Sequence, residues 1–382
     1  MRIALDYTAA LRQGAGIGRY TQGLVAGLAA LETRPDLTLL VAADADRGPF
    51  GGREAPPPFP RRRLPLSSRQ QAILWHRLHL PLPLEWLAGA FDLFHAPDFV
   101  LPPLRRALGV ITVHDLSFLR VPECAEARLV AYLTQAVPHA VRRASRILAD
   151  SVNTQRDLTA LLDVDPARID VVYPGIGPRY QPVTDGEQRR AVAQRYQLNG
   201  PFILSLGTLE PRKNYPRLIR AFAQLRRQSG LAHTLVIGGG KGWLTESLFA
   251  LAEQEKVASF VRFLGYVDEA DLPALYSLAD LYAFPSRYEG FGIPVVEAMA
   301  CGTPVVCADN SSLPEAAGAA AILVNADDTD ALAAALERGL TDQAWRAAAR
   351  RLGQAQAARF SWRASAAQLV AAYAKAGQER SR

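Results

Sequence analysis

Short apolar runs with the composition of buried β-strands alternate along this chain with longer amphipathic segments. A first series of these runs occupies residues 3–5, 37–41, 91–94, 110–113, 147–149 and 169–172. A second series occupies residues 202–206, 234–237, 261–264, 281–284, 305–307 and 321–324. Strands that alternate with helices are typical of parallel sheets covered by helices on both faces. The sequence therefore predicts an α/β protein with two doubly wound, Rossmann-like sheets.

The length of the chain also favours two domains. At 382 residues with 49% hydrophobic residues, the chain exceeds a comfortable single core. Turn-forming residues at 173–178 and 199–201 bracket a polar stretch that contains one helix. We predict an N-terminal domain over 1–178, a linker over 179–200, a C-terminal domain over 201–360 and a final segment over 361–382. The two domains should face each other across a cleft, with ligands bound at the carboxyl ends of the strands.

A glycine turn follows the expected strand at 281–284. Gly290 and Gly292 permit backbone conformations that other residues resist, and Pro294 suits the first position of a helix. The amide groups of Phe291, Gly292 and Ile293 should then point outward at the start of that helix. Helix starts of this kind attract phosphate groups. The turn therefore predicts an anion-binding site.

Two glutamates flank this turn. An arbitrary glutamate is most often a solvated surface residue, and that interpretation applies to Glu289 and Glu297 taken alone. Glu297 lies about one turn inside the expected helix, however, and helical side chains lean toward the N-terminus of their helix. Its carboxylate can therefore reach the same pocket as the glycine turn. A phosphate site beside a carboxylate suggests a nucleotide together with sugar hydroxyls.

Two cations follow the expected strand at 202–206. Arg212 and Lys213 come shortly after Gly207, at the carboxyl end of that strand. Basic residues in loops are usually solvated, but a pair at this position suits a diphosphate group. Charge-assisted hydrogen bonds to phosphate are strong. We assign this role to Lys213 first and to Arg212 second, and we expect Gly207 to be among the donor-binding residues.

The segment EGFGIPVVEAMACGTPVV, at 289–306, resembles the signature of the retaining glycosyltransferases of family 4, which have the GT-B fold. The resemblance extends over nearly the whole chain. It implies that Glu297 binds the ribose of a nucleotide sugar, that Glu289 lies by the donor sugar, and that the amides of 291–293 hold the diphosphate. It also implies a C-terminal helix that crosses back to the N-terminal domain. Many members have arginine directly after the glycine, where this chain has Thr208.

The N-terminal half offers further candidates. A glycine loop with Gly16 and Gly18 has the composition of a phosphate-approach loop, but Arg19 stands where a dinucleotide fingerprint needs a third glycine. His114 follows the expected strand at 110–113, and His95 has a weaker claim. The family resemblance implies that this loop lines the cleft beside the donor phosphates and the acceptor, and that His114 contacts the donor sugar or a phosphate.

The same resemblance assigns recognition of the nucleobase to the loop after the strand at 261–264. There the main-chain groups of Gly265 and Val267 would contact the base. Recognition through the backbone leaves little trace in the side chains. The base is therefore poorly specified by the sequence.

Composition argues against several other classes of protein. Three cysteines lack the spacing of a zinc or redox site and suit small core residues. Three D-x-D triplets, at 44–46, 163–165 and 328–330, suit turns and helix caps better than a metal site. The sequence predicts no metal and no cofactor, because cations and helix amides can stabilise a departing diphosphate. The nucleotide sugar is then a co-substrate.

The sequence predicts a cytoplasmic protein, since it has neither a run of eighteen apolar residues nor a signal peptide. One stretch is strongly basic: seven arginines and one acidic residue lie between Arg47 and Arg77. It also contains Trp75, with Trp86 soon after. Peripheral contact with anionic lipid headgroups and an ordinary solvated loop both fit this composition. No nucleic-acid motif accompanies the charge.

The segments GTLEPRKN, FPSRYEGFG and SSLPEAAG most resemble those of bacterial mannosyltransferases that use GDP-mannose. We therefore expect retaining transfer of a hexose, mannose first, to a hydroxyl of a glycan or lipid-linked oligosaccharide. UDP-sugar donors remain an alternative. A nucleotide-sugar epimerase of the same fold and a non-catalytic nucleotide-sugar binder are the two rival classes.

Overall fold

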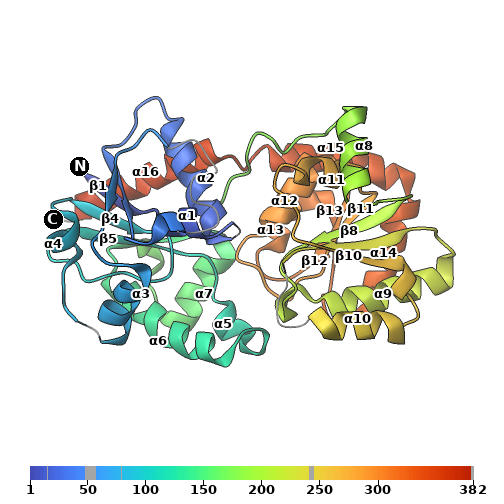
Figure 1. The fold of residues 1–382 in the computed structure, drawn as a ribbon, viewed down its shortest axis with the longest axis horizontal. Coiled ribbons are helices and arrows are strands. Elements are labelled where there is room, and N and C mark those ends of the chain that lie inside the picture. Colours follow the sequence, from blue (N-terminus) through green and yellow to red (C-terminus); the bar gives the residue numbers. More distant parts are fainter. Residues whose placement is uncertain (15, 48–56, 79, 241–244, 380–382) are drawn as a thin grey trace. The chain divides into compact units, whose positions relative to one another are not determined.

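The computed structural model describes residues 1–14, 16–47, 57–78, 80–240 and 245–379 (Figure 1). The chain forms two compact units. Unit 1 comprises Met1–Leu119, Arg128–Gly175 and Ser361–Arg382, and unit 2 comprises Arg120–Ala127 and Ile176–Phe360. Apart from the short segment Arg120–Ala127, the chain thus enters unit 2 after Gly175 and returns to unit 1 at Ser361.

Unit 1 is built on a parallel sheet in which the described residues form seven strands, in the order β3-β2-β1-β4-β5-β6-β7. The strands are β1 (Ile3–Asp6), β2 (Leu37–Val41), β3 (Arg61–Arg63), β4 (Leu93–Ala96), β5 (Leu108–Val113), β6 (Arg146–Ala149) and β7 (Ile169–Val171). All pairs along the sheet are parallel. The predicted doubly wound sheet is confirmed.

Strand β3 is the one strand of this sheet that the apolar pattern did not predict. It consists of three exposed arginines, and it forms the edge of the sheet beside β2. An edge strand exposes unpaired backbone groups, and charged side chains there discourage pairing with other strands. The polar composition that hid β3 from the sequence pattern is therefore what suits it to the edge.

Helices cover both faces of the sheet in unit 1 (Figure 1). One face is covered by α1 (Thr8–Arg12), α2 (Ile17–Ala29) and α16 (Trp362–Glu379). The other is covered by α4 (Leu84–Ala88), α5 (Ser117–Arg120), α6 (Ala127–Arg143), α7 (Val152–Leu162) and the π-helix η2 (Ala72–Arg77). The remaining short helices of unit 1 are α3 (Ser68–Gln71), η1 (Ala45–Arg47) and η4 (Pro166–Arg168), while η3 (Pro122–Cys124) lies in the short segment that belongs to unit 2.

Unit 2 contains a second parallel sheet, whose described strands number six in the order β10-β9-β8-β11-β12-β13. They are β8 (Phe202–Leu206), β9 (Thr234–Gly238), β10 (Val261–Gly265), β11 (Leu281–Phe284), β12 (Val305–Ala308) and β13 (Ala321–Val324). Every strand predicted for this half of the chain is present. The structure therefore confirms the second Rossmann-like sheet.

The helices of unit 2 again lie on both faces of the sheet (Figure 1). They are α8 (Gly186–Arg195), α9 (Tyr215–Ser229), α10 (Thr245–Gln254), α11 (Leu272–Leu278), α12 (Ile293–Ala300), α13 (Leu313–Ala317), α14 (Thr329–Thr341) and α15 (Gln343–Ala357). Three short turns are η5 (Pro211–Lys213), η6 (Ala258–Phe260) and η7 (Gly318–Ala320). The predicted helical tail is interrupted at Asp342, which caps α15, as well as near 360.

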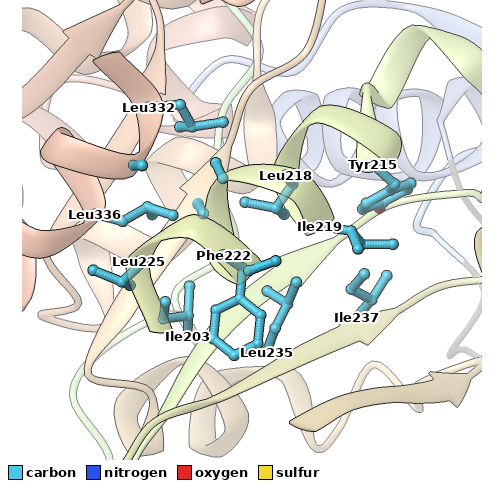
Figure 2. Packing of buried hydrophobic residues seen from close by; sticks show 14 of the residues in the cluster. Ile203, Tyr215, Leu218, Ile219, Phe222, Leu225, Leu235, Ile237, Leu332 and Leu336 are labelled. Carbon is cyan, nitrogen blue, oxygen red and sulfur yellow. The ribbon is translucent and has the colours of Figure 1, made fainter. Parts of the chain in front are cut away.

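Helix α9 shows how one face of this sheet is covered. Leu218, Phe222 and Leu225 recur at helical spacing and are fully or almost fully buried. In Figure 2 the ring of Phe222 lies between Ile203 of β8 and Leu235 of β9. Burying an apolar side chain of this size stabilises the fold by about 1.5–3 kcal/mol. The apolar spacing of α9 therefore fixes which of its sides faces the sheet.

Helix α16 returns to unit 1 and packs against α2, as the family resemblance implied. Three glycines make room for its first residue, Trp362. A Cβ atom at Gly27 would lie 2.1 Å from the backbone oxygen of Trp362, and one at Gly23 would lie 2.1 Å from the indole ring. At Gly175 the corresponding distance to the backbone nitrogen of Trp362 is 2.1 Å. The close approach of the two helices thus depends on residues without side chains.

We predict that Gly27→Ala lowers the free energy of unfolding. Alanine is the better helix former by about 1 kcal/mol, but a methyl group in contact with the backbone of α16 forces the helices apart, and overpacking typically costs about 1–3 kcal/mol. A guanidinium titration measures the change. Gly377→Ala is the matched control, because a Cβ there meets only Met1 Sδ, at 3.7 Å. A Gly27→Ala protein as stable as wild type would contradict the packing described here.

Candidate active site

The strand order of unit 2 reverses between β8 and β11. From β8 the chain continues through β9 to β10 on one side, and from β11 through β12 to β13 on the other. Loops that leave two neighbouring strands in opposite directions create a crevice at the carboxyl ends of those strands, and ligands of α/β sheets bind there. The loops after β8 and β11 carry the cations and the first glutamate predicted from the sequence.

The structure brings three of these predicted residues into direct contact. Arg212 Nη1 lies 2.7 Å from Glu289 Oε2, and Lys213 Nζ lies 2.6 Å from Glu289 Oε1. Arg212 also bonds Glu210 Oε1 at 2.7 Å through Nη2. Glu210 was not predicted, because a single loop glutamate beside a proline carries no distinctive signal. The result is a cluster of two carboxylates and two cations, which we call the β8–β11 charge cluster.

The cluster is largely shielded from solvent. Glu289 is only 7% exposed, and Lys213 Nζ lies 4.9 Å from the centre of the Phe284 ring. Burial opposes ionisation of Glu289, but the charges of Arg212 and Lys213 outweigh it and lower the pKa of that carboxyl to about 2. Burial also lowers the pKa of Lys213, against the attraction of Glu289. Glu289 is therefore a carboxylate throughout the physiological range of pH.

Several polar contacts hold the loops of this cluster in place. Asn214 has left-handed backbone geometry with φ 59°, and its side-chain amide donates to Pro285 O at 3.1 Å and to Ala326 O at 2.7 Å. The backbone N–H of Glu289 donates to Ser311 Oγ, and the hydroxyl of Ser312 donates to Glu289 O. The sequence did not predict these roles of Asn214, Ser311 and Ser312, because each of these residues bonds to a loop that is distant from it in the sequence.

Helix α12 begins at the glycine turn, one residue earlier than the sequence indicates. Gly292 is its N-cap with φ 101°, Ile293 is its first residue, and Pro294 stands in its first turn. A Cβ atom at Gly292 would also lie 2.7 Å from Leu313 Cδ2, so both the conformation and the space there suit glycine. Phe291 turns its side chain inward, where its ring meets that of Phe360 at 5.0 Å.

Glu297 is not a surface residue. It lies on α12, is 1% exposed, and accepts a hydrogen bond from the hydroxyl of Tyr276 at 3.1 Å. Burial, together with the negative charges of Glu297 and Glu289, raises the pKa of Tyr282 far above its ordinary value. The sequence did not predict this role of Tyr276, because a tyrosine in an apolar helix is usually an ordinary core residue.

The other glycine positions predicted in unit 2 lie at the ends of β8 and β10. A Cβ atom at Gly207 would lie 3.1 Å from Lys213 Cε, so this glycine leaves room for the lysine. Gly265 has φ 69°, open space around its Cα, and a carbonyl that accepts the N–H of Gly239 at 2.7 Å. Val267 is buried.

The predicted residues of unit 1 occupy the ends of its strands. His114 follows β5, and both of its ring nitrogens have protein partners: Nδ1 lies 2.7 Å from Asp150 Oδ2, and Nε2 lies 2.9 Å from Pro97 O. A carbonyl and a carboxylate accept hydrogen bonds, so the ring donates from both nitrogens as an imidazolium. Burial opposes this charge, but Asp150 outweighs it and raises the pKa of His114 to about 9.

Gly16 and Gly18 stand at the start of α2. Gly16 is the N-cap, with φ 55°. Gly18 is buried inside the helix, where a Cβ atom would lie 2.0 Å from Gln13 O. Ala15, in the same glycine loop, lies outside the described residues. His95 is fully buried between Tyr373 of α16 and Thr112, and burial lowers its pKa to about 3. It therefore belongs to the core of unit 1.

The acidic triplets at 163–165 and 328–330 form helix caps, whereas Asp44 of the triplet at 44–46 pairs with Arg12 and accepts the N–H of Ser68. Asp328 caps α14 through the N–H of Ala331, and Asp165 accepts from the N–H of Ala167. Over the described ranges, no group of three or more metal-ligating side chains is close enough together to hold an ion. All three cysteines are buried.

The arginine-rich stretch divides into a described and an undescribed part. Residues 48–56 of it lie outside the described residues. Trp75 is buried and donates from Nε1 to Leu82 O, which removes it from any surface role. Trp86, by contrast, is 64% exposed, and Leu78 is 58% exposed. Within the described part of the chain, no helix is both long and apolar enough to span a bilayer.

We predict that Asp150→Asn lowers the pKa of His114 from about 9, because burial is then opposed by the more weakly acting charge of Asp98 without that of Asp150. A folded-state pKa above the unfolded value of about 6.5 stabilises the protein fully below that value, and the stability is lost as pH rises through about 9. An NMR titration of the imidazole protons reports the pKa. Melting temperatures between pH 6.5 and 9.5 report the linkage.

Asp170→Asn is the control for this measurement, since Asp170 pairs with Arg146 and Lys375 rather than with a histidine. Its melting temperature should follow the same pH slope as wild type. If Asp150→Asn shows that slope as well, the His114–Asp150 pair is not what titrates.

Comparison with known proteins places this geometry in a family. The chain matches the family "Glycosyl transferases group 1" over residues 188–359 and "Glycosyltransferase Family 4" over residues 14–180. It is 34% identical over 365 residues to the O-antigen chain mannosyltransferase B of Escherichia coli, covering 94% of this chain and 95% of that protein. It is 32% identical over 223 residues to the serotype-specific mannosyltransferase WbdA of Escherichia coli, covering 58% of this chain and 27% of that protein.

A solved structure agrees in fold. The sucrose-phosphate synthase of Thermosynechococcus elongatus superposes with a TM-score of 0.75 over 98% of both chains, at 22% identity. The similarity to the O-antigen chain mannosyltransferase B extends over almost the entire length of both chains. The structure of the present chain has the two parallel sheets and the returning helix of the GT-B fold. The chain therefore belongs to the retaining glycosyltransferases of family 4.

Proposed function

We propose that this enzyme transfers mannose from GDP-mannose, with retention of configuration, to a hydroxyl of a glycan or lipid-linked oligosaccharide. The acceptor would be an intermediate in the synthesis of a surface polysaccharide. Support for the sugar comes from the two Escherichia coli relatives, both of which are named mannosyltransferases. Support for the polysaccharide comes from the first of them, which is named for the O-antigen chain.

The observation that carries the proposal is the β8–β11 charge cluster at the point where the strand order reverses. A nucleotide sugar presents a diphosphate, a ribose and a hexose, and the residues here suit these groups in turn. Lys213 and the N–H groups of 291–293 would hold the diphosphate. Glu297 would bind the ribose, and Glu289 would bind hydroxyls of the donor sugar. Gly265 and Val267 would contact the base through the main chain.

The chemistry requires stabilisation of the charge that develops on the departing diphosphate. Preorganised cations and amides provide it without reorganisation during the reaction. In the proposed mechanism, the acceptor hydroxyl attacks the face that the diphosphate leaves, and a diphosphate oxygen takes its proton. The contributions proposed for His114, Gly16 and Gly18 come from unit 1.

A thermal-shift screen with GDP, UDP and ADP, and with their mannose, glucose and N-acetylglucosamine derivatives, tests the donor. A ligand that binds only the folded state raises the melting temperature by mass action. The proposal expects the largest shifts from GDP and GDP-mannose. A larger shift with UDP-glucose would transfer the assignment to a UDP-sugar donor, and product analysis with the donor alone would detect an epimerase.

We predict that Lys213→Ala and Glu297→Ala each reduce transfer by about a hundredfold or more, by analogy with loss of one donor to the transition state. The rate of GDP release with GDP-mannose and a mannoside acceptor measures the effect. Arg217→Ala is the control, because Arg217 of α9 contacts Asp327 and Thr329 instead. Wild-type rates in both site variants would refute the assignment. Circular dichroism confirms that each variant is folded.

We also propose that unit 1 makes peripheral contact with anionic lipid through the surface around Trp86, which we call the Trp86 surface. Leu78 and Leu80 are exposed close to it in sequence, and Arg69 and Arg77 are exposed in the same region of the chain. The buried Trp75 of η2 donates to Leu82 O, just before α4, and Trp86 lies in α4. Basic side chains near a bilayer each contribute about 1 kcal/mol. A lipid-linked acceptor would suit this location.

We predict that Trp86→Ser weakens binding to vesicles that contain phosphatidylglycerol by about tenfold, since insertion of a large apolar side chain is worth about 1.5–3 kcal/mol. Cosedimentation at low and high salt measures binding. Phe249→Ser, which changes an exposed aromatic residue of unit 2, is the control. If wild type and Trp86→Ser bind these vesicles equally well, the Trp86 surface is not the lipid contact.

A further inference from the structure

Arg212 and Lys213 are neighbours in the sequence but make different contacts. Arg212 bridges two carboxylates, with Nη2 at 2.7 Å from Glu210 Oε1 and Nη1 at 2.7 Å from Glu289 Oε2. Its Nη1 also donates to Tyr288 O at 2.8 Å. The guanidinium is therefore already engaged with three protein oxygens. An arginine held on two sides in this way is fixed in position.

Among the described residues, Lys213 makes one ion pair, with Glu289 Oε1 at 2.6 Å. Its ammonium carries three N–H groups, and Nζ also lies 4.9 Å from the centre of the Phe284 ring. The two cations and two carboxylates of the β8–β11 charge cluster sum to zero charge. A diphosphate that binds here therefore needs a cation that can turn toward it, and Lys213, held by one carboxylate oxygen, can do so more readily than Arg212, which bridges two carboxylates.

We propose that Arg212 is a positioning residue, anchored by Glu210, that holds the Glu289 carboxylate in place for the donor sugar and does not itself bind the diphosphate. This inference rests on the function proposed above and refines it. It separates two cations that the sequence alone could only rank. It also gives Glu210 a role that no sequence pattern indicated.

The planar shape of the guanidinium explains why an arginine is needed. Its fork of N–H groups pairs with two carboxylates in fixed directions, whereas the compact ammonium of lysine acts as a point charge. The backbone of the same loop is tied as well, because Arg287 N–H donates to Arg212 O at 2.8 Å. With Arg212 in place, one oxygen of Glu289 is held by the bridge and the other faces Lys213. Binding of diphosphate to Lys213 then leaves Glu289 paired.

The charge-preserving variant Arg212→Lys separates this role from that of a phosphate cation. We expect Arg212→Lys and Arg212→Gln both to reduce the rate of GDP release from GDP-mannose by about tenfold or more, because misplacing a group at the reacting centre is costly even over small distances. Both should bind GDP with a Kd within about threefold of wild type. Calorimetry gives the Kd, and Lys213→Ala should weaken GDP in the same assay.

Glu210→Gln is the milder second variant, and it tests the anchor without removing the arginine. We expect it to lower the rate and leave the Kd for GDP unchanged. Arg217→Lys is the matched control for an arginine change in unit 2 away from the cluster. If Arg212→Lys keeps the wild-type rate, or if Arg212→Gln weakens GDP binding more than tenfold, Arg212 is a phosphate cation and the inference is overturned.

A measurement without ligand separates this inference from the donor assignment. Carbon-13 NMR of the Glu289 carboxyl should show no titration in wild type between pH 7 and 4.5, since its pKa is about 2. In Arg212→Gln the signal should begin to titrate in that range, because burial then raises the pKa. If the Glu289 signal does not titrate in Arg212→Gln either, the inference that Arg212 holds the Glu289 carboxylate is overturned. If wild type binds no nucleotide or nucleotide sugar while the signal does move, the donor assignment fails and the positioning of Glu289 stands.

Discussion

The buried carboxylate of Glu289 is the group on which the geometry of unit 2 most depends. A carboxylate that is 7% exposed is costly unless cations and hydrogen bonds compensate it. Arg212 and Lys213 supply the charge, and they come from the loop of a neighbouring strand. Compensation therefore forces the loops after β8 and β11 to approach each other. The crevice that the reversed strand order permits is given its shape by this ion pairing.

Unit 1 uses the same kind of interaction with different residues. His114 after β5 is bonded to Asp150 after β6 and to Pro97 after β4. One charged ring thus ties together three segments that leave the same edge of the sheet. In both units a buried charge holds loops that the strands alone would leave unconnected. Loops positioned by a rigid scaffold are where binding residues are usually found.

The sequence predicts those parts of the fold that depend on apolar pattern. Strand β11 is a continuous apolar run and β8 is apolar except for Ser205, so the limits of both could be placed to the residue. Strand β3 escaped because its arginines carry no apolar signal, and its existence depends on the neighbouring β2. Trp75 was misjudged for a related reason: an aromatic residue in a basic stretch looks exposed until its packing is known.

The candidate site could be predicted by residue type but not by partner. Glu289 and Arg212 are 77 residues apart, and no local rule states that they meet. Asp150 and Tyr276 were missed because each acts through another residue, His114 in one case and Glu297 in the other. A glycine turn or a proline at a helix start leaves a local signature, whereas an ion pair between distant loops does not.

The return of α16 to unit 1 has a consequence for the order in which the protein is made. The core of unit 1 includes Leu369 and Tyr373, which emerge from the ribosome only after all of residues 176–360. Those 185 residues (360 − 175) take roughly ten to forty seconds at about 5–20 residues per second. During that interval the nascent α2 has no α16 to cover its glycine side. Unit 2 lies later in the sequence, but it is the first unit to have all of its residues available. Unit 1, which contains the N-terminus, should therefore be the last to complete its folding during translation.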